Sequence, residues 1–306
     1  MDVREWSLVI FTILGKMSVG AFLVFLVVYF FAARKAGREE AERLSDLSLL
    51  AIGPVLLLGM AASVLHLGNV MNAYRAVSNL GSSWLSREIF FGVLFAIVGG
   101  AFGLMQWRKI GPFGLRISLA VLAALLGIAL VVSMAAVYLL PTQPAWDTWA
   151  TPVRFGVTTL LLGVLAMGAA FVANYAILQR RDPSCAEAQC TLLRSVLRWL
   201  AISGVVLLGV ELVVIPLQIS TIATGSAFGL SSIEMLLSEY GAVLGAQLVL
   251  VFLGAGVFGV FVYTNAMSAG RENVMSGMAY AAFAIVLVAE ILGRYLFYAT
   301  QVSIGL

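Results

Sequence analysis

The chain has 306 residues, of which 62% are hydrophobic and 11% are charged. Soluble domains carry about 25% charged residues, so this composition excludes an ordinary soluble domain and indicates an integral membrane protein. The formal net charge of +3 is small, and the placement of the charges along the sequence therefore matters more than their sum.

A transmembrane helix needs about 20 mostly apolar residues, and eight runs meet this requirement. In sequence order the runs are 7–33, 46–68, 88–106, 113–140, 152–178, 196–220, 236–264 and 275–300. All six tryptophans fall at the ends of runs, which is typical of the aromatic belts at the membrane surfaces. We therefore predict an all-α bundle of eight transmembrane helices that forms a single domain over residues 1–306. The glycine pairs Gly99–Gly103 and Gly241–Gly245 predict close helix contacts.

The basic residues favour one side of the membrane. Most of the 18 lysines and arginines lie in or beside the connections that follow the first, third, fifth and seventh runs. The positive-inside rule assigns these connections to the cytoplasm. Both termini are therefore predicted on the non-cytoplasmic side of a bacterial or archaeal inner membrane.

The connections themselves carry no recognisable chemistry. Every one is short, and none contains a nucleotide-binding loop, a metal-ligand cluster or a nucleophile motif. Cys185 and Cys190 share one hydrophilic connection without a CxxC spacing or a nearby histidine, which favours free thiols over a disulfide and argues against a metal site. Any chemistry must therefore occur among the helices or in a partner protein.

Ionisable side chains inside the spans need a reason, because each Asp, Lys or Arg costs about 2.5–3.5 kcal/mol at mid-span. The predicted orientation places Lys16 and His66 in the outer half of the membrane and Glu211 between its centre and that half. The third span begins on the same side, which brings Arg87 and Glu88 to the outer interface. Nearly all of the intramembrane charge is therefore predicted to gather in one leaflet.

The last span carries a polar face. Glu290, Arg294 and Tyr298 are spaced four residues apart, so they share one side of a helix. One interpretation is a self-contained ion pair that allows Arg294 to lie in the membrane. The other is the polar wall of a binding site, and the two are compatible.

His66 is the only histidine of the protein. It could be an interfacial histidine that binds a backbone carbonyl. However, the connection 68–87 is rich in Asn, Ser and Gly and can fold back into the bundle, and its end brings Trp84 and Glu88 to the same depth. Imidazole and carboxylate commonly accept and pass on protons near neutral pH. A single histidine also excludes a haem held by two histidines of this protein, although a His/Met haem remains formally possible.

An apolar cleft with a few polar groups, open to lipid, suits a lipid-soluble molecule that gains and loses protons at one end. A quinone fits this description, since its tail prefers lipid and its carbonyls need donors such as His66 or Lys16. Its reduced form releases two protons that need an acceptor.

Four stretches of the sequence resemble the DmsC-like membrane anchor subunits of dimethyl-sulfoxide-reductase-type molybdenum enzymes. They are 5–12 at the start of the first span, 65–68 together with 85–89, 146–152 before the fifth span, and 290–294 with Phe297 and Tyr298. These stretches run from one end of the sequence to the other in order, whereas residues 185–285 add only hydropathy.

The resemblance implies an eight-span anchor for anaerobic respiration that binds no haem and holds a menaquinol site near one membrane face. Electrons would pass from the quinol to an iron–sulfur subunit and then to a molybdopterin catalytic subunit. The important histidine of the family corresponds to His66 and its carboxylate to Glu88. Lys16 departs from the family pattern, so it could donate to a quinone carbonyl or pair with Glu211 or Glu88.

The leading hypothesis is therefore a quinol-oxidising membrane anchor without metal or haem of its own. The residues predicted around its site are Lys16, His66, Arg87, Glu88, Arg294 and Tyr298, supported by Trp84, Glu211 and Glu290. The same anchor could run in reverse as a quinone reductase for a sulfite-type dehydrogenase. A purely structural tether and a secondary transporter are the alternatives of other classes, and the absence of paired discontinuous helices or repeat symmetry argues against the transporter.

Overall fold

The computed structural model describes residues 3–66, 78–181, 186–265 and 272–304. In this described part the protein is helical and contains no strand. Seven of its helices are long and apolar enough to cross a membrane, and an eighth crossing is present if α9 (Ala227–Ser238) and α10 (Gly241–Asn265) count as one broken span. The predicted all-α membrane bundle is confirmed. Cys185 and the first half of the connection 68–87 lie outside the described residues.

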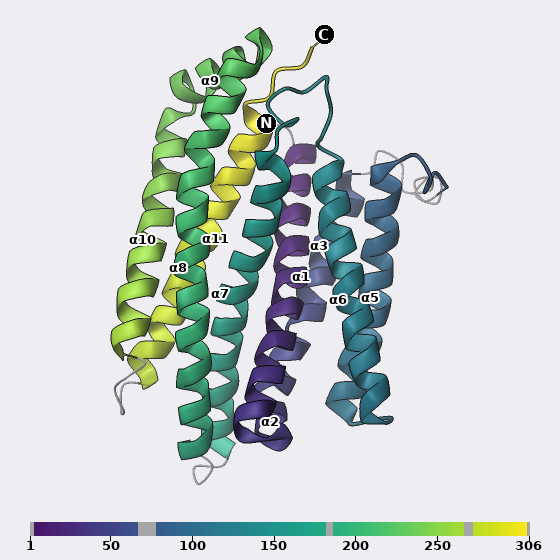
Figure 1. Cartoon of the computed structure of the whole chain (residues 1–306), viewed down its shortest axis with the longest axis vertical. Coiled ribbons are helices and arrows are strands. Elements are labelled where there is room, and N and C mark those ends of the chain that lie inside the picture. Colours follow the sequence, from purple (N-terminus) through teal and green to yellow (C-terminus); the bar gives the residue numbers. More distant parts are fainter. Residues whose placement is uncertain (1–2, 67–77, 182–185, 266–271, 305–306) are drawn as a thin grey trace.

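The remaining helices, in order, are α1 (Val3–Ala36), α2 (Arg38–Leu50), α3 (Ile52–His66), α5 (Trp84–Arg108), α6 (Phe113–Ala136), α7 (Ala150–Arg181), α8 (Ala186–Gly225) and α11 (Glu272–Ala299). Figure 1 shows the first-half helices α1, α3, α5 and α6 beside the second-half helices α7, α8, α10 and α11. Helix α1 packs against both α3 and α7 and so joins the two halves. The N- and C-termini lie at one end of the bundle, which we call the termini end, and α2 lies at the opposite end (Figure 1).

The two halves meet backbone to backbone where α1 crosses α7. A Cβ atom at Gly20 would overlap the carbonyl group of Thr159, and a Cβ atom at Gly163 would overlap the backbone of Gly20. Glycine allows this approach because it has no side chain. The crossing therefore sets the polar face of α1 directly beside α7.

The glycine pairs singled out in the sequence do not make such contacts. A Cβ atom at Gly103, Gly241 or Gly245 would meet nothing within 4 Å in the described part, and one at Gly99 would only touch side chains. The predicted close helix contacts at these pairs are therefore wrong. The spacing of two glycines marks a narrow helix face, but it does not say whether another helix lies opposite.

Two predicted spans are interrupted. Helices α2 and α3 meet at Ala51, inside the predicted span 46–68. Pro54 accounts for this break, because proline has no N–H to donate to the carbonyl of Leu50 and its ring crowds that carbonyl. Helices α9 and α10 are bent by 77° at a break inside the predicted span 236–264.

The predicted fourth span ends at Ala136 instead of residue 140, and the segment 137–149 forms turns at the termini end. This segment is tied to the C-terminal tail, since the N–H of Ile304 donates to the carbonyl of Thr142 at 2.9 Å. Because the helix stops early, Tyr138 lies in a turn and its side chain is buried in the bundle.

The α2 end is held by ion pairs between α2 and the α5–α6 hairpin. The ammonium of Lys109 lies 2.8 Å from Glu42 and 2.5 Å from Asp46, and Arg116 lies 3.8 Å from Glu42. Lys109 follows α5 and Arg116 lies in the first turn of α6, so the pairs fasten this hairpin to α2. That this end faces the cytoplasm stays a prediction from the positive-inside rule.

Candidate functional site

Buried polar side chains gather between the two halves, toward the termini end. They come from α1, α5, α7 and α11 and from the turn after α6, and each is less than a tenth exposed; they are Thr12, Lys16, Glu88, Tyr138, Thr158, Glu290, Arg294 and Tyr298. Arg294 lies within about two turns of the end of α11, and Glu88 within about two turns of the start of α5. Charged groups in such surroundings are expensive and mark a functional site by default.

Arg294 is the centre of this cluster. Its Nε donates to the hydroxyl of Thr12 at 3.0 Å, and its Nη2 donates to the hydroxyl of Tyr298 at 2.7 Å. The hydroxyl of Tyr298 in turn lies 2.5 Å from that of Tyr138. Burial, with the neighbouring Tyr298, raises the pKa of Tyr138 well above its usual value, so this phenol stays protonated and can donate.

Aromatic rings enclose the guanidinium. Its carbon lies 4.3–4.5 Å from the centres of four rings, those of Tyr138, Phe155, Phe297 and Tyr298. The indole of Trp146 stacks on Phe297 and donates to its carbonyl at 2.7 Å. Ring faces attract cations most strongly where water is excluded, so the rings stabilise the charge of Arg294 in the bundle.

Glu290 lies one turn from Arg294 but does not pair with it in the described structure. One of its oxygens, Oε2, accepts from the hydroxyl of Thr158 on α7 at 2.8 Å. The self-contained ion pair considered for α11 is therefore wrong, because each of the two side chains binds a different helix. Lys16 lies within electrostatic reach of both, and its ammonium is 4.8 Å from the centre of the Phe155 ring.

Glu88 joins the cluster from α5. Its side chain is buried, and Arg294 is the charged group whose field reaches it. Arg87 and Trp84, which precede Glu88 in the sequence, are not part of the cluster. Arg87 donates to the carbonyls of Leu80 and Gly81 at 2.8 and 2.7 Å and lies over the ring of Trp84, which is 42% exposed. Arg87 and Trp84 thus hold the turn before α5 and lie apart from the buried cluster.

His66 is the last residue of α3, and its side chain lies outside the described residues. Its role as a proton-handling contact of the site stays a prediction.

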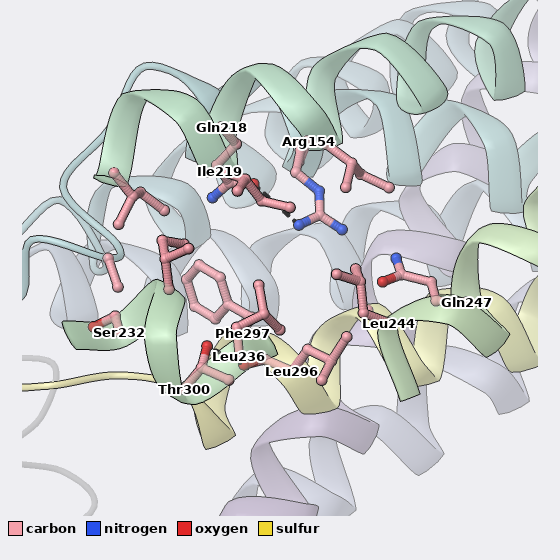
Figure 2. Close-up of a pocket in the computed structure, with 15 residues that line it drawn as sticks. Arg154, Gln218, Ile219, Ser232, Leu236, Leu244, Gln247, Leu296, Phe297 and Thr300 are labelled. Atoms are coloured by element: carbon pink, nitrogen blue, oxygen red, sulfur yellow. Dashed lines mark hydrogen bonds between the residues drawn. The ribbon is translucent and has the colours of Figure 1, made fainter. Parts of the chain in front are cut away.

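A second polar group adjoins the first on the side of α8 and α10. Arg154 of α7 lies 3.5 Å from Glu211 and donates to the side-chain oxygen of Gln218 at 3.1 Å. Figure 2 shows Arg154, Gln218 and Gln247 directed toward the same space. Gly293 makes the room, since a Cβ atom there would collide with the Gln247 amide and lie 3.1 Å from Arg154. Glu211 therefore pairs with Arg154, and not with Lys16 as considered from the sequence.

Several polar atoms at the junction of the two groups have no hydrogen-bond partner within the described residues. They are both carboxyl oxygens of Glu211, Oε1 of Glu290, Nε2 of Gln247 and Nε of Arg154. Buried polar atoms are nearly always bonded, so such exceptions call for an explanation. The arrangement can accept protons or bind polar ligand atoms at this junction.

The described part of the bundle contains three cavities, and the first two adjoin these residues. One of about 20 Å³ is lined by Lys16, Glu290 and Arg294, and one of about 60 Å³ extends from Arg154 to Ser232. The third, about 360 Å³, is an apolar groove between α3 and α5 whose lining includes Gly99, Gly100 and Gly103 of α5. Among these three, the groove alone reaches the size range of ligand pockets, which begins at about 300 Å³.

Sequence reasoning did not single out several residues of the two groups, namely Thr12, Tyr138, Arg154, Thr158, Gln218 and Gln247. Arg154 begins a predicted span and therefore resembles an interfacial residue. The hydroxyl and amide side chains are not ionisable within the membrane, so a search for ionisable residues inside the spans does not identify them. A search for every polar residue in an apolar run would have found Gln218 and Gln247.

The sequence matches a family model and known proteins over nearly its whole length. The family model described as DMSO reductase anchor subunit (DmsC) matches residues 1–300. The anaerobic dimethyl sulfoxide reductase chain YnfH of Escherichia coli is 30% identical, and the match covers 99% of this protein and 97% of that one. A second anaerobic dimethyl sulfoxide reductase chain of the same organism is 29% identical with the same coverage.

Two further similarities are more distant. A sulfite dehydrogenase subunit of Allochromatium vinosum is 26% identical over 56% of this protein and 54% of its own length. Among solved structures, the bd oxidase from Geobacillus thermodenitrificans superposes with a TM-score of 0.65 at 11% identity, covering 97% of this protein and 85% of the matched one. At that identity the likeness concerns the fold alone.

Proposed function

This chain belongs to the family of DMSO reductase anchor subunits, and we propose that it oxidises a quinol in the membrane and passes the electrons to its partner subunits. The partners are an iron–sulfur subunit docked at the termini end and a molybdopterin catalytic subunit beyond it. The complex would support anaerobic respiration by reducing dimethyl sulfoxide or a related oxide. No haem is needed if the quinol lies close to the iron–sulfur subunit.

The buried cluster around Arg294 is the observation that carries this proposal. Oxidation of a quinol to a quinone releases two electrons and two protons, so the site needs proton acceptors and hydrogen-bond donors away from bulk water. Glu88 and Glu290 are buried carboxyl groups, Lys16 lies within electrostatic reach of Glu290, and Tyr298 binds Arg294 in the same cluster. Side chains of this kind inside a membrane mark proton relays.

The apolar groove supports a lipid-soluble substrate with a long tail. Its lining includes Phe95 and Gly103 of α5, the helix that carries Glu88 nearer its start. Phe95 lies about two turns along α5 from Glu88. A head group beside Glu88 could therefore extend an isoprenoid tail along this groove. We assign His66, at the end of the neighbouring helix, as the contact of the quinone head.

The direction of electron flow has an alternative. The similarity to a sulfite dehydrogenase subunit favours a second possibility, in which the anchor receives electrons and reduces a quinone. Stoichiometry is the same in reverse, with two protons taken up for each quinone reduced. Assays of the purified complex with dimethyl sulfoxide and menaquinol, and separately with sulfite and menaquinone, distinguish the two.

The test of the quinol site uses the complete complex with two electron donors. We expect His66→Ala and Glu88→Gln to reduce menaquinol-dependent turnover by roughly 100-fold or more, the usual contribution of a proton-transfer group. Turnover with reduced viologen, which delivers electrons directly to the partner subunits, should not change. Normal menaquinol turnover in both variants would refute the assignment, and loss of both activities would indicate failed assembly of the complex.

A further inference from the structure

We propose that Glu290 and Glu211 form a proton-accepting carboxyl pair, and that the two cavities beside Arg154 carry protons from this pair toward the termini end. The inference rests on the proposed function, because the quinol supplies the protons. The inference states where these protons are accepted and by which route they leave. The proposed quinol contacts at Glu88 and His66 do not answer either question.

The pair is buried and has free acceptor capacity. Glu290 and Glu211 are 3% and 1% exposed, and three of their four oxygens have no hydrogen-bond partner in the described part. The two carboxyl groups lie beside one another, and the charged groups that face Glu211 from other helices are Glu290, Arg154 and Lys16. Two adjacent carboxyl groups can hold one proton between them, because that proton removes the repulsion of two like charges.

The inner cavity begins at Glu290, and the outer cavity adjoins it at Arg154, the residue that pairs with Glu211. The inner cavity is lined by Lys16 and Glu290, the outer cavity by Gln247 and Ser232, and both share Arg154. A volume of about 60 Å³ in the outer cavity has room for several water molecules, since one needs about 10–15 Å³ by this measure. Gln218, Gln247, Ser232 and Thr300 lie along its wall (Figure 2), and such polar groups can orient those molecules.

Arg154 lies between the two cavities and is held from both sides. Gln218 accepts from its Nη1, and Glu211 lies 3.5 Å from its Nη2. A proton on the pair weakens the attraction between Glu211 and Arg154, because the pair then carries less negative charge. The guanidinium is thus positioned to respond to the charge of the pair at the entrance to the outer cavity.

Protons and electrons balance along this route. The O–H bond of a quinol hydroxyl breaks, and its proton reaches Glu290, directly or through Glu88 and Lys16, where a new O–H bond forms. The proton is shared with Glu211 and then passes through water beside Arg154 into the outer cavity, which restores the starting charge of the pair. Two protons leave in succession for each quinol, while its two electrons pass to the iron–sulfur subunit.

The test is Glu211→Gln in the complete complex reconstituted in vesicles. We expect menaquinol-dependent turnover to fall by roughly 100-fold and the remaining rate to show a larger solvent deuterium isotope effect. Viologen-dependent turnover and the binding of a fluorescent quinone analogue should stay unchanged, and Glu211→Asp should restore part of the rate. The matched control is Glu234→Gln, which removes an exposed carboxylate of α9 and should change none of these values.

Gln247→Leu provides a second variant that keeps the side-chain volume and leaves both carboxyl groups intact. We expect it to slow menaquinol turnover and raise the isotope effect, and it decides the matter if Glu211→Gln does not assemble. Wild-type rates in these variants would overturn the route while leaving the quinol function standing. Loss of analogue binding would also overturn it, because Glu211 would then belong to the head-group site. Failure of the wild-type complex to oxidise menaquinol would instead refute the proposed function.

Discussion

Arg294 of α11 donates a hydrogen bond from its Nε to the hydroxyl of Thr12 on α1, so a residue near the C-terminus is fixed to one near the N-terminus. The same guanidinium donates to Tyr298 and is enclosed by aromatic rings. It therefore links the two halves of the bundle at the place where the buried carboxyl groups gather.

Arg294→Lys should preserve the charge but lose the planar fork that binds two partners at once. We expect menaquinol turnover to fall by roughly 10-fold or more, because Tyr298 and Thr12 are no longer held. The free energy of unfolding should fall by on the order of 1 kcal/mol for each lost hydrogen bond, the scale measured between membrane helices. Kinetic assays and thermal melting of the complex measure the two effects. Arg108→Lys, at the exposed end of α5, is the control, and equal effects of both substitutions would contradict the central position of Arg294.

Gly100→Leu should fill the groove between α3 and α5. Gly100 lines the groove, and a Cβ atom there would meet nothing within 4 Å, so the larger side chain can enter the empty space. We expect KM to rise for a quinol with a long isoprenoid tail and to stay unchanged for a short-tailed quinol. Ala101→Leu, on an exposed position of the same helix, should leave both KM values unchanged. The same response to both tail lengths would exclude the groove as the tail site.

Gly20→Ala should destabilise the crossing of α1 and α7. The added methyl group would overlap the Thr159 carbonyl, which belongs to a helix backbone and cannot turn aside. Overpacking of this kind costs about 1–3 kcal/mol, so the melting temperature and the yield of assembled complex should fall. Gly156→Ala on α7 meets no atom within 4 Å in the described structure and should be tolerated. A stable Gly20→Ala variant would show that the two helices can separate without loss of the fold.

Local sequence was sufficient to predict the membrane environment, the all-helical class and the residues that needed polar neighbours. These follow from local composition, because an apolar run must form a helix in lipid whatever its neighbours are. The placement of Glu88, Glu290 and Arg294 toward one end of the bundle also follows from helix order and length.

The hydrogen-bond partners of these side chains could not be predicted from the sequence in the same way. Glu290 and Arg294 share a helix face and suggest an ion pair, but their hydrogen bonds go to Thr158 of α7 and Thr12 of α1. Spacing along one helix says which side chains share a face, and only the packing of the neighbouring helices decides what that face meets. The breaks at Ala51 and between α9 and α10 likewise depend on local backbone geometry that hydropathy does not register.

Only the packing of the helices brings Arg154, Gln218 and Gln247 together beside the carboxyl pair. These residues come from α7, α8 and α10. In the sequence Arg154 lies at the start of its predicted span, and Gln218 and Gln247 are not ionisable. Their meeting depends on the space left at Gly293, where a Cβ atom would collide with Gln247. Composition fixes how many polar groups a membrane protein must bury, whereas helix packing decides which of them contact one another.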